Sequence, residues 1–189
     1  MYICFSIHIF NVQCEGLNTT EILYLLLHYF IGVERLLNNK SKKNCNKMQS
    51  TTIDKILHLS KEFLGCFPLD KLPSFPTEFP KSMIINTHKS NQPGEHWIAL
   101  VLTKKHCFYF DTFGLPIINK TIMQYLNSQY KVVRYSNVCI QHITSNKCGE
   151  FSIVFVVQVK SKTTYEKFIS QFNLEDVRKN DIIIENCVI

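Results

Sequence analysis

Cys148 occupies a position in the sequence where a thiol could act as a nucleophile. The segment SNKCGEFSIVFVVQ, residues 145–158, places it between polar residues and a long apolar run, with a glycine directly after it. A thiol nucleophile requires a base within hydrogen-bonding distance and a third group that orients the base. The alternative is a small core residue, because free cysteine is among the most buried residue types. The choice depends on which other residues could meet Cys148.

His96 and Asp111 are candidates for the base and for the orienting acid. The segment HWIALVLTKKHCFYFDTFG has an apolar run on each side of a Lys-Lys pair, which predicts a β-hairpin with strands near 96–103 and 106–112. With a tight turn at the lysines, His96 would lie near residue 113, and a shift of two residues or a β-bulge would align it with Asp111. Both residues also have purely structural explanations, as a histidine at a strand start and as an aspartate that forms a turn.

Other polar residues remain alternatives to this pair. Five further histidines could replace His96, although none precedes a strand whose hairpin partner ends in a carboxylate: His28, His58, His88, His106 and His142. Gln141, taken alone, is typical of a surface amide.

The segments before the hairpin have distinct patterns. Apolar residues from Ile53 to Leu64 approximate a helical stripe that ends at Gly65, with Asp54 in its first turn. Three residues could cap the start of this helix: Ser50, Thr51 or Thr52. Prolines make residues 66–82 an extended, irregular loop that can be neither a helix nor a central strand. SMIINTH then predicts a short buried strand.

After the hairpin, the sequence predicts further helices and strands. TIMQYLNSQY predicts a helix, KVVRYS a strand, TTYEKFISQF an amphipathic helix, and EDVRKNDIIIENCVI a tail. CGEFSIVFVVQVK stays open, because its Val and Ile content favours a strand whereas its length of 13 residues favours a helix. This order of elements predicts the α+β class.

Composition limits the class of protein. With 189 residues, of which 46% are hydrophobic, the chain is long enough for one globular domain with its own core. Asn, Lys and Ser crowd together around 38–50, so we expect an accessory N-terminal extension, residues 1–47, and a domain of residues 48–189. The extension is either an unusual addition or an artefact of the gene model. The net charge of +6 and the basic patch at 38–47 leave weak nucleic-acid binding as a secondary expectation.

Cysteine spacing and short apolar runs exclude several other classes. The eight cysteines include no CxxC and no close pair, so we expect free thiols, no metal site, and a reduced intracellular setting, nuclear or cytoplasmic. The first dozen residues lack the basic start and the cleavage site of a signal peptide, so secretion is not expected. ILYLLLHYFIGV, at 22–33, has 12 residues and is too short to span a bilayer.

Three segments in order resemble those of a known family. GEHWIALVL, FYFDTFGLP and IQHITSNKCGEFSIVFV resemble the adenovirus-type (adenain-like) cysteine endopeptidases, especially the relatives encoded by Maverick/Polinton virus-like DNA transposons. The wider clan includes the proteases of SUMO-like and ubiquitin-like proteins. The resemblance covers roughly residues 48–185. It implies a papain-like fold, in which helices flank a central mixed β-sheet and the nucleophilic cysteine begins a buried helix.

The resemblance also implies a role for each candidate residue. Cys148 would be the nucleophile and His96 the general base. Asp111 would orient the base, and Gln141 would donate to the oxyanion together with the backbone N–H of Cys148. Helix N-terminal amides and a protonated histidine favour a thiolate, which explains a cysteine at the exposed end of a core element. Trp97 would be either a cleft wall or a core residue.

These roles predict a cysteine endopeptidase that forms an acyl-enzyme without a metal or a cofactor. Its polypeptide substrates would be structural proteins of the virus or transposon. Two alternatives stay open: an isopeptidase that acts on SUMO-like or ubiquitin-like conjugates, and an inactive relative kept as an interaction module. We expect a monomer with no membrane partner.

Overall fold

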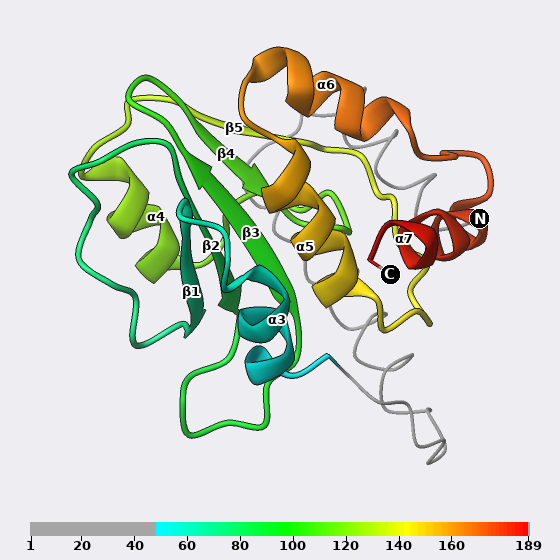
Figure 1. The fold of residues 1–189 in the computed structure, drawn as a ribbon, viewed down its shortest axis with the longest axis horizontal. Coiled ribbons are helices and arrows are strands. Elements are labelled where there is room, and N and C mark those ends of the chain that lie inside the picture. The colour runs from blue at the N-terminus through cyan, green and yellow to red at the C-terminus, as the bar shows by residue number, and fades with distance from the viewer. Residues whose placement is uncertain (1–47, 189) are drawn as a thin grey trace, which may run out of the picture. The chain divides into compact units, whose positions relative to one another are not determined.

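The computed structural model describes residues 48–188, and Figure 1 shows the arrangement of their helices and strands. The elements are α3 (Ser50–Leu57), β1 (Phe63–Pro68), β2 (Lys81–Asn86), β3 (Trp97–Leu102), β4 (Cys107–Phe110), α4 (Lys120–Asn127), β5 (Val133–Tyr135), α5 (Cys148–Gln158), α6 (Lys162–Ser170), the 3-10 helix η1 (Val177–Lys179) and α7 (Asn180–Val188). The predicted extension, residues 1–47, lies outside the described residues, together with its basic patch and its apolar run.

Five strands form one mixed sheet in the order β1-β2-β3-β4-β5. The inner pairs, β2–β3 and β3–β4, are antiparallel, whereas the outer pairs, β1–β2 and β4–β5, are parallel. Helix α5 crosses one face of the sheet, and α4 packs on the other face (Figure 1). The predicted α+β class is therefore confirmed.

Strand β3 is the centre of this fold because it contributes to two cores. Alternate residues face the α5 side of the sheet: Trp97, Ala99 and Val101. The residues between them face the α4 side: Ile98, Leu100 and Leu102. All six are buried, as expected for a strand with both faces covered. Close packing on both faces fixes the start of β3, and His96 directly precedes it.

The predicted hairpin is confirmed, and its register is the one expected for a tight turn at Lys104 and Lys105. Strands β3 and β4 pair without interruption, with Ala99 opposite Phe110. The expected shift of two residues or bulge is therefore wrong. If this register is continued, Asp111 falls opposite Ile98 and lies diagonally from His96.

The predicted helix from Ile53 to Leu64 ends early. Helix α3 stops at Leu57, and the residues from Phe63 onward form β1 instead. Gly65 does not end a helix; it takes a φ of +129° inside β1, where the register with β2 is irregular. Pro68 ends this strand at the edge of the sheet, where proline is tolerated. The first three residues of the expected loop, 66–68, therefore belong to a strand.

The expected cap of α3 is also wrong. Gln49 occupies the N-cap position and makes no side-chain capping hydrogen bond. Asp54 is not in the first turn; its Oδ1 accepts the backbone N–H of Cys66 at 2.9 Å. The aspartate therefore ties α3 to β1 instead of stabilising the helix start.

Two C-terminal segments are helices. CGEFSIVFVVQ is α5, which crosses the sheet rather than pairing with it, so the strand alternative is wrong. The expected tail from residue 175 contains η1 and α7. In α7, Ile184 is fully buried whereas Ile182 is 62% exposed. The run of isoleucines therefore forms a helix that is buried on one side only. Of the helices between residues 48 and 188, none has the length and apolar character that a membrane crossing requires.

Candidate active site

Cys148 is the first residue of α5, as predicted, and it is 9% exposed. Lys147 occupies the N-cap position, and no side chain caps this end of the helix. The first backbone N–H groups of a helix have no intrahelical acceptors, and their partial positive charge stabilises an anion. The start of α5 therefore presents unpaired backbone N–H groups beside Cys148.

His96 and Asp111 lie just beyond the paired part of the β3–β4 hairpin and contact each other. The distance between His96 Nε2 and Asp111 Oδ1 is 3.2 Å. The same carboxylate oxygen accepts the backbone N–H of Phe113 at 2.8 Å. The Phe113 ring also stacks on the imidazole, with the ring centroids 5.0 Å apart. Asp111 is thus both a turn former and the partner of His96, two functions that the sequence presented as alternatives.

The environment of the imidazole favours its protonated form. Burial of the ring lowers the pKa of His96, but the charge and hydrogen bond of Asp111 oppose this, and the Cys148 side chain adds to their effect. The balance raises the pKa of His96 from its usual 6.5 to about 10. The ring nitrogen Nε2 is within hydrogen-bonding distance of Asp111, and the Cys148 side chain also acts on the ring. Because Nε2 faces the carboxylate, Nδ1 is the nitrogen left for the thiol.

Gln141 is not a surface amide, because it is only 1% exposed. Its Oε1 accepts the hydroxyl hydrogen of Thr112 at 2.6 Å, and its Nε2 donates to the carbonyl of Ser145 at 3.0 Å. The Ser145 carbonyl can only accept, so it determines which end of the amide is the NH2 group, and the Thr112 hydroxyl then donates to the amide oxygen. One N–H of Nε2 remains for another acceptor, and the contact with Ser145 holds this side chain against the loop that leads into α5.

Thr112 and Asn180 support this arrangement, and sequence analysis missed both. The Thr112 carbonyl accepts the backbone N–H groups of Ile140 and Gln141, at 2.9 and 3.2 Å. Asn180, the first residue of α7, donates its amide to the Ile140 carbonyl at 2.9 Å. In the sequence, Thr112 is a polar residue within FYFDTFG and no pattern links it to its partner Gln141, which lies 29 residues away.

Trp97 lies in the core beside the start of α5. It is 8% exposed and belongs to the same buried cluster as Cys148. Its indole N–H donates to the carbonyl of Met48 at 3.1 Å. Met48 in turn packs against Gly149, the residue directly after Cys148. The core alternative for Trp97 is therefore confirmed, and the residue also borders the site.

The remaining described thiols have different surroundings. Burial raises the pKa of the Cys107 thiol, and burial together with Asp54 raises the pKa of the Cys66 thiol. Both thiols are free, as is that of the exposed Cys187. Three more cysteines lie outside the described residues: Cys4, Cys14 and Cys45. Within residues 48–188, no three His, Cys, Asp or Glu side chains are grouped as a metal site would require.

The alternative histidines are engaged elsewhere. His88 Nε2 is 2.7 Å from Glu95 Oε2, and His58 Nδ1 is 2.6 Å from the carbonyl of Lys55. His142 Nδ1 is 2.8 Å from the Thr144 hydroxyl. His106 lies at the hairpin turn, where its N–H and carbonyl pair with Thr103, and His28 lies outside the described residues.

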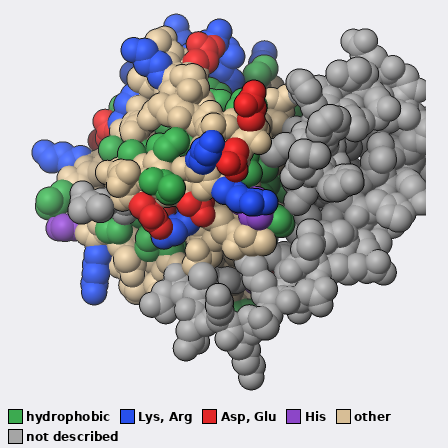
Figure 2. Space-filling view, turned by 90° about the vertical axis from the view of Figure 1, so that its right-hand side faces the viewer, with side chains coloured by type: hydrophobic (Ala, Val, Ile, Leu, Met, Phe, Trp, Pro, Cys, Tyr) green, Lys and Arg blue, Asp and Glu red, His purple; other side chains and the backbone are tan. Residues whose placement is uncertain are grey.

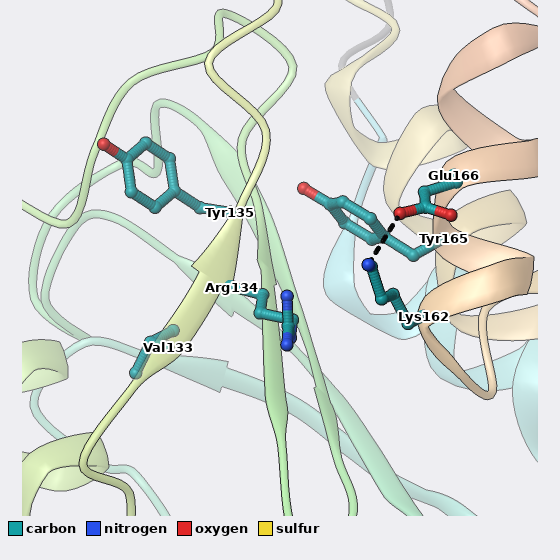
Figure 3. Close-up of a pocket in the computed structure, with 6 residues that line it drawn as sticks. All are labelled: Val133, Arg134, Tyr135, Lys162, Tyr165 and Glu166. Atoms are coloured by element: carbon teal, nitrogen blue, oxygen red, sulfur yellow. Dashed lines mark ion pairs between the residues drawn. The ribbon is translucent and has the colours of Figure 1, made fainter.

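A separate cavity of about 280 Å³ lies between β5 and α6 (Figure 3). Arg134, Lys162 and Glu166 are among its lining residues, and the latter two form an ion pair at 3.4 Å. None of the four predicted site residues lines it. The cavity is therefore distinct from the cluster around Cys148.

Basic and acidic side chains are intermixed on the face drawn in Figure 2. At the start of α5, Lys147 Nζ contacts Glu185 Oε1 at 2.9 Å and Glu150 Oε1 at 3.5 Å. The described part of this face therefore presents no continuous basic surface of the kind that nucleic acids bind. Weak nucleic-acid binding stays a prediction.

Comparisons with known proteins agree with the motifs in the sequence. Residues 63–177 match the family model of the adenovirus endoprotease. No curated protein matches the sequence. Among solved structures, the crystal structure of the selenomethionine form of the ASFV pS273R protease has 20% sequence identity over 51% of this chain, with a TM-score of 0.33. The aligned part spans 40% of that protease chain.

The family match confirms the resemblance and the predicted fold, an α+β fold of the papain-like, adenain type. The matched segment contains all four predicted site residues: His96, Asp111, Gln141 and Cys148. Since this segment covers more than half of the sequence, the chain belongs to the adenovirus endoprotease family.

Proposed function

We propose that the protein is a cysteine endopeptidase in which Cys148 is the nucleophile and His96 the general base and acid. Asp111 orients the imidazole and stabilises its protonated form. The observation that carries the proposal is the contact of His96 Nε2 with Asp111 Oδ1 at 3.2 Å, directly before a strand that packs in the same core as Cys148. The proposed catalytic domain is residues 48–189, within which the family match falls.

The first half of the reaction forms a thioester. The Cys148 thiolate attacks the carbonyl carbon of the scissile bond, and the electron pair of the C=O bond moves onto its oxygen. The tetrahedral intermediate then collapses, and the C–N bond breaks. Protonated His96 gives its proton to the departing nitrogen, so an amine leaves and the acyl group stays on sulfur.

The second half restores the enzyme. Neutral His96 removes a proton from a water molecule, whose oxygen attacks the thioester carbon. The C–S bond breaks, the carboxylic acid product leaves, and the thiolate and imidazolium are present again. Protons and electrons balance over the cycle without a cofactor.

Gln141 and the start of α5 are the proposed oxyanion donors. The second N–H of Gln141 Nε2 is available because the Ser145 carbonyl fixes the amide orientation and takes only one hydrogen, while Thr112 donates to the amide oxygen. The backbone N–H of Cys148 would be the second donor, and the helix end has no side-chain cap that would compete for this region. Donors held in place before the reaction stabilise the intermediate most effectively.

The proposed substrates are polypeptides, and the resemblance suggests structural proteins of a virus or transposon. The test is cleavage of a peptide library by the full-length protein, with Cys148→Ala as the inactive variant. Cys187→Ala is the matched control, because it removes an exposed thiol on α7. We expect wild type and Cys187→Ala to cleave the same peptides, and Cys148→Ala to cleave none.

Two outcomes contradict the endopeptidase. Cleavage of SUMO-like or ubiquitin-like conjugates without cleavage of any peptide would identify an isopeptidase. A wild-type protein that cleaves neither substrate class, or a Cys148→Ala variant that remains active, would contradict the proposed chemistry altogether.

A further inference from the structure

Met48 bridges the two residues that directly follow the proposed reacting pair. Trp97 follows His96 in sequence, and its indole N–H donates to the Met48 carbonyl at 3.1 Å. Gly149 follows Cys148, and the Met48 side chain packs against it. One residue therefore contacts the start of β3 through its backbone and the first turn of α5 through its side chain.

The contact with Gly149 leaves no room for a side chain there. A Cβ atom on Gly149 would lie 2.7 Å from both Cβ and Cγ of Met48, and 3.3 Å from Cδ1 of Trp97. Atoms held near the Met48 backbone cannot yield as the tip of a flexible side chain can. Glycine is thus required for the close approach of Met48, Trp97 and the first turn of α5.

Met48 is itself fixed by the helix that follows it. Helix α3 begins two residues later, at Ser50, and is anchored by Ile53 and Leu57, which are 0% and 4% exposed. Both belong to the core that contains Trp97 and Cys148, and Met48 packs against that core. Its contacts thus link three elements, α3, β3 and α5.

The geometry points to Met48 as a positioning residue that sets the separation of His96 and Cys148. His96 lies just before β3 and Cys148 begins α5, so small movements of these two elements relative to each other would change the separation of the two side chains. Met48 holds the neighbours of both residues, so its removal would let β3 and α5 move relative to each other near the thiol. This inference rests on the proposed function, since it concerns the same pair.

The test compares full-length Met48→Ala, which removes the contacts, with Met48→Leu, which keeps an apolar side chain of similar volume. Two readouts are needed: kcat/KM for a cleaved peptide, and the rate of Cys148 alkylation by limiting iodoacetamide between pH 5 and 9. Leu126→Ala is the control for general destabilisation, because Leu126 is fully buried in the core on the opposite face of the sheet.

We expect Met48→Ala to lower kcat/KM by about 10- to 100-fold, since small misplacements of reacting groups have effects of this size. It should also weaken the alkylation of Cys148 at acidic pH. Met48→Leu should stay within about threefold of wild type in kcat/KM, because it fills most of the same space. Leu126→Ala should lower the midpoint of thermal unfolding but leave the pH profile of Cys148 alkylation unchanged.

Three results separate the possible failures. If wild type itself shows no preferential alkylation of Cys148, the proposed thiolate–imidazolium pair is wrong, and the inference about Met48 is wrong as well. If wild type shows the preference and Met48→Ala retains both it and kcat/KM, only the inference is overturned. If Met48→Ala does not fold, Trp97→Phe decides, because it removes the indole N–H and keeps an aromatic ring; an unchanged pH profile then overturns the inference.

Discussion

The contact between His96 and Asp111 predicts that the folded protein loses stability as the pH rises from 6.5 toward 10. The perturbation is pH, applied to the full-length Cys148→Ala protein so that proteolysis does not occur during the measurement. In the folded wild type, burial lowers the pKa of His96, but Asp111 and then Cys148 raise it to about 10. In the unfolded chain the pKa returns to the usual 6.5.

The sign follows from proton binding. Between the two pKa values the folded state holds a proton that the unfolded state has lost, so the free energy of unfolding decreases as pH rises. The stabilisation is complete below pH 6.5 and is lost by about pH 10. A rise of this size corresponds to at most about 5 kcal/mol. Without the thiol of Cys148 the loss should be smaller but keep the same sign, because Asp111 supplies the larger contributions.

The assay is urea denaturation at intervals from pH 5 to pH 10. The matched variant is Cys148→Ala with Asp111→Asn, which keeps the size of the side chain but removes its charge. Burial then lowers the pKa of His96, so stability should rise as pH increases through the acidic range, the opposite sign. Apart from His96 and Asp111, the titrating groups are shared by the two proteins and cancel in the comparison. Identical pH dependence in both variants would refute the reasoning.

Three further changes test separate parts of the site and fold. Asp111→Asn in the active protein should lower kcat by roughly 10²- to 10⁴-fold, measured with saturating peptide, and a smaller effect would mean that the base needs no orienting acid. Gln141→Glu should lower kcat by about 10²- to 10³-fold, and Thr112→Val, which keeps the donor amide, should cost less; equal losses would argue against Gln141 as an oxyanion donor. Phe155→Ala should reduce the free energy of unfolding by about 3–5 kcal/mol in urea denaturation, because this fully buried ring stacks on Phe110 with centroids 4.5 Å apart; a loss below about 1 kcal/mol would contradict the close packing of α5 on β4.

Local patterns predicted the centre of the fold. Two apolar runs around a pair of lysines are enough to indicate β3, β4 and their turn, because hairpin pairing is a local interaction. The same pairing brings His96 and Asp111 close together. The segment from Cys148 to Gln158 could not be assigned from its periodicity, because a helix that is apolar all round has no polar face to reveal its period.

Other elements depend on contacts that no local pattern contains. The apolar residues from Phe63 onward continue the spacing of helix α3, and only pairing with β2 makes them a strand. The run of isoleucines in α7 gains its buried side from packing against α5. Tertiary burial therefore overrides the local pattern at both ends of the domain.

The supporting residues of the site were hidden for the same reason. Thr112 donates to an amide oxygen 29 residues away, and Met48 receives the indole N–H of a tryptophan 49 residues away. Neither residue stands at a spacing from its partner that a sequence pattern marks, so the sequence gives no indication of their place. Only the fold brings them to Gln141 and to the residues beside His96 and Cys148.

Selective alkylation of Cys148 tests the central claim most directly. The full-length protein is treated with limiting iodoacetamide at pH 6, and each cysteine is quantified by peptide mass spectrometry. An ordinary thiol is protonated and slow at this pH, whereas a thiolate paired with protonated His96 reacts. Cys148 should therefore be labelled well before the exposed Cys187, and His96→Ala should abolish the preference. Uniform labelling, or a preference that persists in His96→Ala, would contradict the pair on which the proposed activity depends.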